Sequence, residues 1–205
     1  VKYHLPSAVS LYQNMVDMNS SAEPIKIVKE KLQGRNNYLT SFYFRQGGNF
    51  YVLSYEIAGT TRHTFIDTGD FRYSDQILAF LAENRVSLGA TDRIIITHGH
   101  PDHCGLAALL AKESGARILA HSGFRSFVEN KQEQRWTSTF DKSELVQCDI
   151  EYLTPKTNAN QKNLAGVDFP LLKESLSIGE AGRLEVIGCP EDGTTHSPDQ
   201  LCVLY

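Results

Sequence analysis

The sequence is 205 residues long, carries a formal net charge of −4, and is 41% hydrophobic and 21% charged. These values are ordinary for a soluble globular domain with one sizeable core. No apolar run approaches the roughly 18 residues of a membrane span, and no dense basic run suits nucleic acid. We therefore expect neither a membrane nor a nucleic acid as a partner.

The cysteine pattern indicates a reducing compartment. The sequence has four widely separated cysteines and no C-x-x-C pair; they are Cys104, Cys148, Cys189 and Cys202. Thiols spaced in this way are typical of a cytoplasmic protein rather than of a disulfide framework. The first residues show no charged-then-apolar signal segment.

In chain order, the N-terminal part predicts mainly strands. Residues 10–18 have some helical spacing, which the Glu23-Pro24 pair ends. Runs rich in β-branched and aromatic residues then predict strands over residues 25–28, 38–44, 50–57 and 64–67.

Strands and helices alternate in the next part of the chain. Residues 74–84 place apolar side chains at helical spacing, which predicts an amphipathic helix packed on a sheet. A strand over 93–96, a helix over 104–112 and a strand over 117–120 follow. This alternation predicts a layered α/β domain.

The pattern weakens between residues 122 and 170, which we interpret as a variable insert within a single domain spanning 1–205. A helix is expected over 124–133 and a short strand over 146–153, whereas 157–167 is rich in Asn, Lys and Gln and predicts a solvated loop. Strands are predicted again over 184–187 and 201–205.

The segment from His98 to His103 is the most informative in the chain. It places three imidazoles and a carboxylate directly after the apolar strand that ends at Ile96. Imidazole and carboxylate are common ligands of zinc and neighbouring transition metals. Open α/β sheets bind ligands at the carboxyl ends of their strands. The residues predicted to bind metal are His98, His100, Asp102 and His103.

The spacing of these ligands favours two ions. Residues i and i+2 of an extended segment face the same way, so His98 and His100 can chelate one ion together. Asp102 and His103 begin the next turn and point towards an adjacent ion. Two ions that share ligands leave open positions for water, unlike a closed structural zinc site.

The H-x-H-x-D-H block resembles the signature of the metallo-β-lactamase fold superfamily, whose members are mostly binuclear metallohydrolases. Two other segments resemble the same family in the same order: Phe65-Ile66-Asp67-Thr68-Gly69 and Thr195-His196-Ser197-Pro198-Asp199. The resemblance covers residues 49–205. It implies an α/β, four-layer αββα sandwich, of which this chain covers the N-terminal half and part of the second, and it makes His196 the third ligand of the His98/His100 ion.

The sequence departs from the family pattern in two places. Thr195 stands where the family usually has glycine, so residues 190–195 are expected to form a locally rebuilt loop. The family's two later ligands, a metal-bridging aspartate and a last histidine, have no counterpart before Tyr205. We therefore expect the chain to be incomplete at its C-terminus, with these ligands supplied by further residues or by another chain.

The resemblance implies a metal-dependent hydrolase. A metal-bound hydroxide would attack a small-molecule ester, lactone, thioester or amide, with Asp102 as the catalytic residue that binds metal and orients the nucleophile. The expected cofactor is zinc, as two ions, with iron or manganese as alternatives. Two other functions stay open: an iron-dependent dioxygenase or other redox member of the fold, and a non-catalytic scaffold with a degraded second metal site.

Two further residues have open roles. The resemblance implies that Asp67 accepts a hydrogen bond from a ligand histidine or its loop. The alternative is that Asp67 caps the Thr68-Gly69 turn. His121 follows the strand at 117–120 and has no second ligand at i+2 or i+4, so we expect a hydrogen-bonded structural histidine.

Overall fold

The computed structural model describes residues 24–32, 36–44, 48–130, 133, 140–154, 161–180, 182–189 and 196–205. The helical spacing at 10–18 and the rebuilt loop at 190–195 lie outside these residues. Among the described helices, none is long and apolar enough to cross a membrane.

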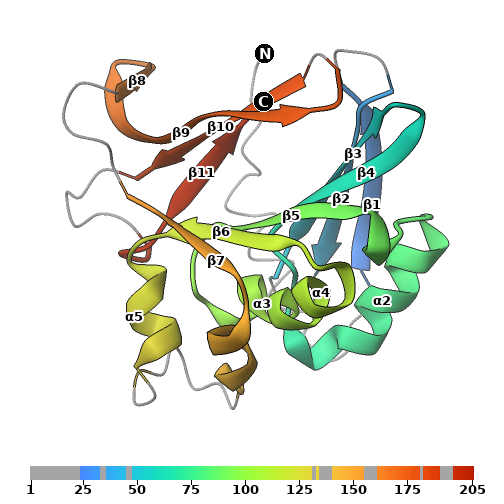
Figure 1. Ribbon diagram of the computed structural model, residues 1–205, viewed down its shortest axis with the longest axis horizontal. Coiled ribbons are helices and arrows are strands. Elements are labelled where there is room, and N and C mark those ends of the chain that lie inside the picture. Colours follow the sequence, from blue (N-terminus) through green and yellow to red (C-terminus); the bar gives the residue numbers. More distant parts are fainter. Residues whose placement is uncertain are drawn as a thin grey trace.

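A seven-stranded sheet in the order β1-β2-β3-β4-β5-β6-β7 forms the centre of the molecule (Figure 1). The first four strands are antiparallel neighbours, and β4 to β7 are parallel. The strands are β1 (Pro24–Lys31), β2 (Tyr38–Phe44), β3 (Phe50–Ile57), β4 (Thr60–Ile66), β5 (Thr91–Ile96), β6 (Arg117–His121) and β7 (Ile150–Leu153). All of the predicted N-terminal and central strands are therefore confirmed.

A second, four-stranded sheet lies over one face of the first, in the order β11-β10-β9-β8 (Figure 1). Its strands are β8 (Gln161–Leu164), β9 (Val167–Ile178), β10 (Gly182–Gly188) and β11 (Leu201–Leu204). The strands predicted at 184–187 and 201–205 are confirmed as β10 and β11.

The loop predicted over 157–167 is wrong for its described part, because residues 161–164 form β8. This strand pairs with β9 in a hairpin whose turn residues, Ala165 and Gly166, both have positive φ, as tight hairpin turns require. Its polar side chains reflect its position at the edge of the sheet, where backbone pairing rather than apolar burial defines the strand. Strand β9 was not predicted from the sequence.

Helices cover the opposite face of the large sheet (Figure 1). They are α2 (Ser74–Glu83), α3 (Pro101–Cys104), α4 (Ala107–Ser114) and α5 (Phe124–Glu129), with short 3-10 turns η1 (Phe71–Tyr73), η2 (Leu88–Ala90) and η3 (Ser143–Gln147). The predicted helices over 74–84 and 124–133 are present, although α5 ends early. The strand expected over 146–153 begins only at Ile150, because η3 occupies the preceding residues.

The single helix predicted over 104–112 is confirmed only from Ala107 on, because the chain is divided between α3 and α4 at Gly105. The Gly105 N–H donates to the carbonyl oxygen of Gly69 at 3.1 Å instead of continuing a helix. A Cβ at this position would lie 2.6 Å from the Pro101 oxygen and 2.7 Å from the Gly69 oxygen. Only glycine fits this approach, which fixes α3 against the loop that follows β4.

Two apolar cores hold the layers together, because alternate residues of each central strand face opposite sides. On β3, Phe50 and Val52 pack with the helices, whereas Leu53 and Tyr55 pack with the second sheet. Helices, sheet and sheet thus form three layers, which correspond to the N-terminal half and part of the second half of the predicted four-layer αββα sandwich. Among the described residues no helix covers the outer face of the second sheet. The packing fixes the carboxyl ends of β4 and β5, where the predicted ligands begin.

Candidate metal centre

The predicted ligands come from two segments that meet at the carboxyl end of β5. His98 and His100 follow β5 and precede α3, and they are only 5% and 7% exposed. His196 lies between β10 and β11 and is exposed. The Leu201 N–H donates to the Thr97 carbonyl oxygen at 2.8 Å, which brings the start of β11 beside the end of β5.

The side chains of His98, His100 and His196 converge. Their candidate ligand nitrogens all lie within 4.8 Å of one another. His196 Nε2 lies 3.0 Å from His100 Nδ1, and the ring centroids of His98 and His100 are 4.6 Å apart. Zinc–nitrogen bonds of about 2.0–2.1 Å place two nitrogens of one ion at separations of this order. The three imidazoles could therefore hold one ion.

Two buried polar atoms at this site have no hydrogen-bond partner among the described residues: His98 Nε2 and Asp102 Oδ1. A buried polar atom left unpaired costs about 1–3 kcal/mol, so native structures seldom leave one without a partner of some kind. His98 Nδ1 lies 3.1 Å from the Thr97 hydroxyl, which leaves Nε2 as the nitrogen available inside the cluster. An imidazole nitrogen and a carboxylate oxygen are both metal donors, so the residues present fit a cation.

The electrostatics of His98 also suit a metal ligand. Burial, followed by the neighbouring imidazoles of His103 and His100, lowers the pKa of His98 to about 3. A ligand imidazole must be neutral at the donating nitrogen. His98 is therefore neutral at physiological pH.

Asp102 and His103 lie next to this cluster. His103 Nε2 is 3.6 Å from Asp102 Oδ2, and the rings of His103 and His98 have centroids 4.1 Å apart. Among the described residues, no third Asp, Glu, His or Cys side chain forms a compact ligand group with Asp102 and His103. The role of Asp102 and His103 as ligands of a second ion therefore stays a prediction.

Asp67 lies beneath His103 and is almost fully buried. Its carboxylate accepts hydrogen bonds of 2.8 Å from His103 Nδ1, the Thr97 N–H and the Thr97 hydroxyl. Burial lowers the pKa of His103, but the hydrogen bond with Asp67 and the charges of Asp67 and Asp102 outweigh it and leave the pKa raised. Asp67 thereby fixes the ring of His103 with Nε2 turned towards Asp102.

The alternative role for Asp67, as a cap of the Thr68-Gly69 turn, is not the one observed. Instead, Thr68 donates to the His103 carbonyl oxygen through its N–H at 2.7 Å and its hydroxyl at 3.0 Å. The Leu106 N–H in turn donates to the Thr68 hydroxyl at 3.1 Å. Thr68 therefore anchors the ligand-bearing segment to β4, a role that the sequence alone did not suggest.

Asp199 was also missed as a site residue. Its carboxylate is fully buried, accepts a hydrogen bond from the Gly99 N–H at 2.9 Å, and accepts a second from the Ser197 hydroxyl. The only signal in the sequence was its place three residues after His196. His121 lies outside the ligand group, and its Nδ1 accepts a hydrogen bond of 3.2 Å from the Gly123 N–H.

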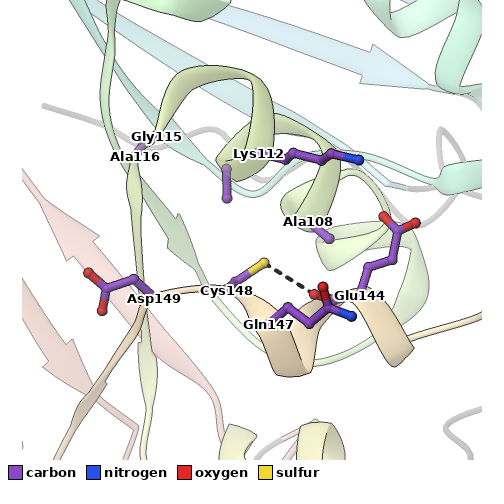
Figure 2. A pocket seen from close by; sticks show the side chains of 9 residues that line it. Ala108, Lys112, Gly115, Ala116, Glu144, Gln147, Cys148 and Asp149 are labelled. Atoms are coloured by element: carbon purple, nitrogen blue, oxygen red, sulfur yellow. Dashed lines mark hydrogen bonds between the residues drawn. The ribbon is translucent and has the colours of Figure 1, made fainter.

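A pocket of about 380 Å³ lies elsewhere, between α4 and the segment from η3 to β7 (Figure 2). Its lining includes Ala108, Lys112, Glu144 and Cys148, and the Cys148 thiol donates to the Glu144 carbonyl oxygen at 3.4 Å. None of the predicted metal ligands lines this pocket. The predicted metal ligands therefore lie at the sheet edge and not in this cavity.

Comparison with known families agrees with this fold. The model of the metallo-beta-lactamase superfamily matches residues 47–203, and the chain belongs to that superfamily. The match spans the signature block and the segment that carries His196.

Curated relatives match shorter segments. A UPF0173 metal-dependent hydrolase of Rubrobacter xylanophilus is 33% identical over 88 residues, which cover 37% of this chain and 36% of that protein. A UPF0173 metal-dependent hydrolase of Rhizobium etli is 46% identical over 48 residues, or 23% of this chain and 20% of that protein. The chain thus matches about a third or less of the length of these relatives.

Solved structures share the fold. The apo state of the chemotaxis sensor ODP from T. denticola has a TM-score of 0.54 at 16% identity, covering 87% of this chain and 59% of that chain. A flavoprotein from Thermotoga maritima has a TM-score of 0.50 at 16% identity, covering 87% of this chain and 39% of that chain. At this identity the likeness concerns the fold alone.

Proposed function

We propose that the protein is a metal-dependent hydrolase of small molecules that binds two zinc ions at the carboxyl end of β5. The observation that carries this proposal is the convergence of the His98, His100 and His196 side chains. Within this cluster His98 Nε2 is buried and has no hydrogen-bond partner among the described residues. Membership of the metallo-beta-lactamase superfamily and the names of the curated relatives support hydrolysis. We place the protein in the cytoplasm, because its cysteines suit a reducing compartment.

In this proposal the two ligand groups bind their metal ions with different affinities. His98, His100 and His196 hold one ion, and three neutral imidazoles are a common catalytic zinc set. Asp102 and His103 contribute to the second ion, which would bind weakly with these two ligands alone. The remaining ligands of the second ion come from outside the described residues.

When bound, zinc lowers the pKa of a water molecule to about 7 and polarises a carbonyl oxygen. The side chains of this chain then position the reactants. Asp102 has one oxygen, Oδ2, facing His103 and a second, Oδ1, without a partner among the described residues, so it can hold and orient the attacking water. The hydrogen bond between Asp67 and His103 Nδ1 fixes the His103 ring beside Asp102. The scissile group is an ester, lactone, thioester or amide.

The experiment is a hydrolysis assay of the full-length, zinc-loaded protein against a chromogenic β-lactam, a lactone, an aryl ester and a thioester. We expect turnover of at least one substrate and a loss of at least about 100-fold for His98→Ala. His121→Ala is the matched control and should retain turnover, because His121 lies outside the ligand group. No turnover of any substrate with two zinc ions bound would contradict the proposal. Purification with iron and a visible absorption band would favour the redox alternative.

A further inference from the structure

Two cysteine side chains meet at the base of the segment that carries His196. Cys189 directly follows β10, and Cys202 lies in β11. Their Sγ atoms are 4.0 Å apart, which is close to van der Waals contact for sulfur. The sequence spacing of these residues gave no hint of the pair, because it depends on the pairing of the two strands.

The strand register explains why the thiols face each other. Ile187 pairs with Cys202 across the antiparallel strands, and the Cys189 N–H donates to the Gln200 carbonyl oxygen at 3.1 Å. Residues two apart on a strand point to the same face, so Cys189 lies on the face shared by Ile187 and Cys202. The two thiols are therefore diagonal neighbours on one face of the hairpin.

Their surroundings distinguish this pair from the other cysteines. Cys189 and Cys202 are both partly exposed, so a small reagent can reach them. Cys104 is completely buried in the helix-side core, and the partly exposed Cys148 donates its thiol hydrogen to the Glu144 carbonyl oxygen at the far pocket. Because the two Sγ atoms are already near contact, thiol oxidation is the chemistry that this pair favours.

We propose that Cys189 and Cys202 are a modification site that forms a reversible intramolecular disulfide with a low-molecular-weight disulfide as oxidant. One thiolate attacks the oxidant and displaces one small thiol, giving a mixed disulfide. The second thiolate then attacks the protein sulfur and displaces the other small thiol. Two Sγ–H bonds and the S–S bond of the oxidant break, one Sγ–Sγ bond forms, and the two protons leave with the two small thiols.

The geometry requires a modest rearrangement. A disulfide bond is about 2.05 Å long, so the sulfur atoms must approach from 4.0 Å. A change of χ1 rotamer moves a sulfur without moving the backbone, and Cys189 lies just beyond the last paired residue of β10, where the strands can adjust. The disulfide would close a covalent loop over residues 190–201 and would join the two ends of the segment that contains His196.

The sequence allows a direct test by peptide mapping of the full-length protein. No lysine or arginine lies between Cys189 and Cys202, so the tryptic peptide that begins at Leu184 contains both cysteines. After incubation with glutathione disulfide, we expect this peptide to lack two hydrogens and to resist alkylation. Cleavage after Glu191 should then leave its two parts linked until dithiothreitol is added.

Variants define the specificity of the reaction. Cys189→Ser and Cys202→Ser should each abolish the internal link and leave a glutathione adduct on the remaining cysteine. Cys104→Ser and Cys148→Ser are matched controls and should leave the link intact. Peptide mapping of the unaltered protein decides the question even if a variant fails to fold. Stable glutathione adducts at both positions, a link between two molecules, or two alkylatable thiols after oxidation would each overturn the proposal.

Discussion

The carboxylate of Asp199 and the backbone N–H of Gly99 form a hydrogen bond of 2.9 Å in the buried floor of the candidate metal centre. Gly99 lies between His98 and His100, and Asp199 lies three residues after His196. One hydrogen bond therefore joins the two segments that supply the three converging imidazoles. Because Ser197 donates to the other carboxylate oxygen, Asp199 also fixes the segment to which His196 belongs.

This connection predicts that Asp199→Ala weakens metal binding without removing a ligand. Loss of the Gly99 hydrogen bond leaves the Leu201–Thr97 backbone bond to hold the two segments and loosens the segment of His196. Residues that orient metal ligands typically account for 10–100-fold in affinity. We expect a loss of this size in zinc affinity, measured by competition with a chromogenic chelator. Asp149→Ala is the control, because Asp149 pairs with Arg117 on the surface. An affinity equal to that of the unaltered protein would show that Asp199 does not position the ligands.

Asp67→Asn should affect the two ions differently. The amide cannot accept all three of the hydrogen bonds that Asp67 receives from Thr97 and His103, so the His103 ring loses its fixed orientation. We expect the weaker ion to lose about 10–100-fold in affinity, while the tighter ion is retained. Stepwise zinc titration of the full-length protein measures both. Asp92→Asn is the control, since Asp92 bonds Tyr55 and Arg62 at the other end of the sheet. An equal loss for both ions would contradict this role.

Lys142 supports the end of α5. Its side chain is buried, and its ammonium donates to the carbonyl oxygens of Phe127, Asn130 at 2.9 Å and Glu133 at 2.5 Å. Lys142→Met leaves these carbonyls without their charged donor, so we expect the free energy of unfolding to fall by about 3 kcal/mol. Urea denaturation measures the change. Lys112→Met, on the exposed face of α4, should change stability by less than about 0.5 kcal/mol. Similar effects of both substitutions would show that Lys142 does not stabilise the end of α5.

His63 predicts a pH dependence of stability. Burial lowers the pKa of His63 below its ordinary value of 6.5 in the folded protein. Below about pH 6.5 the unfolded chain therefore binds a proton that the folded chain does not, and stability falls as pH drops towards the folded-state pKa. Above that range His63 contributes no pH dependence. Unfolding free energies measured between pH 5 and 8 should show less loss at the acid end for His63→Gln. An unchanged pH profile would contradict this prediction.

Four of the candidate site residues could be located from the sequence because they lie close together in it. His98, His100, Asp102 and His103 lie within one short segment after an apolar strand, so their position at the sheet edge follows from the sequence, whereas their role as metal ligands stays a prediction. Strands with buried apolar side chains, such as β5 and β6, were predictable for the same reason. The structure places these residues together, and the metal they bind stays a proposal.

Features that depend on contacts between distant residues could not be read from the sequence. The break between α3 and α4 requires the Gly69 carbonyl to meet Gly105. Strand β8 is a local case: it pairs with β9 across a two-residue turn, but its polar side chains give no apolar pattern. Asp199 likewise acquires its role only when β11 is placed beside β5. The hydrophobic pattern of a sequence does not report contacts with residues far along the chain or pairing between polar strands, so these features were not predicted.

The most direct test of the metal centre is a crystal structure of the full-length protein grown with zinc, with the ion located by its anomalous scattering. We predict a zinc ion about 2.0–2.1 Å from Nε2 of His98 and bound also by ring nitrogens of His100 and His196. A zinc ion that occupies other residues, with His98 Nε2 left unbound under saturating zinc, would contradict the account.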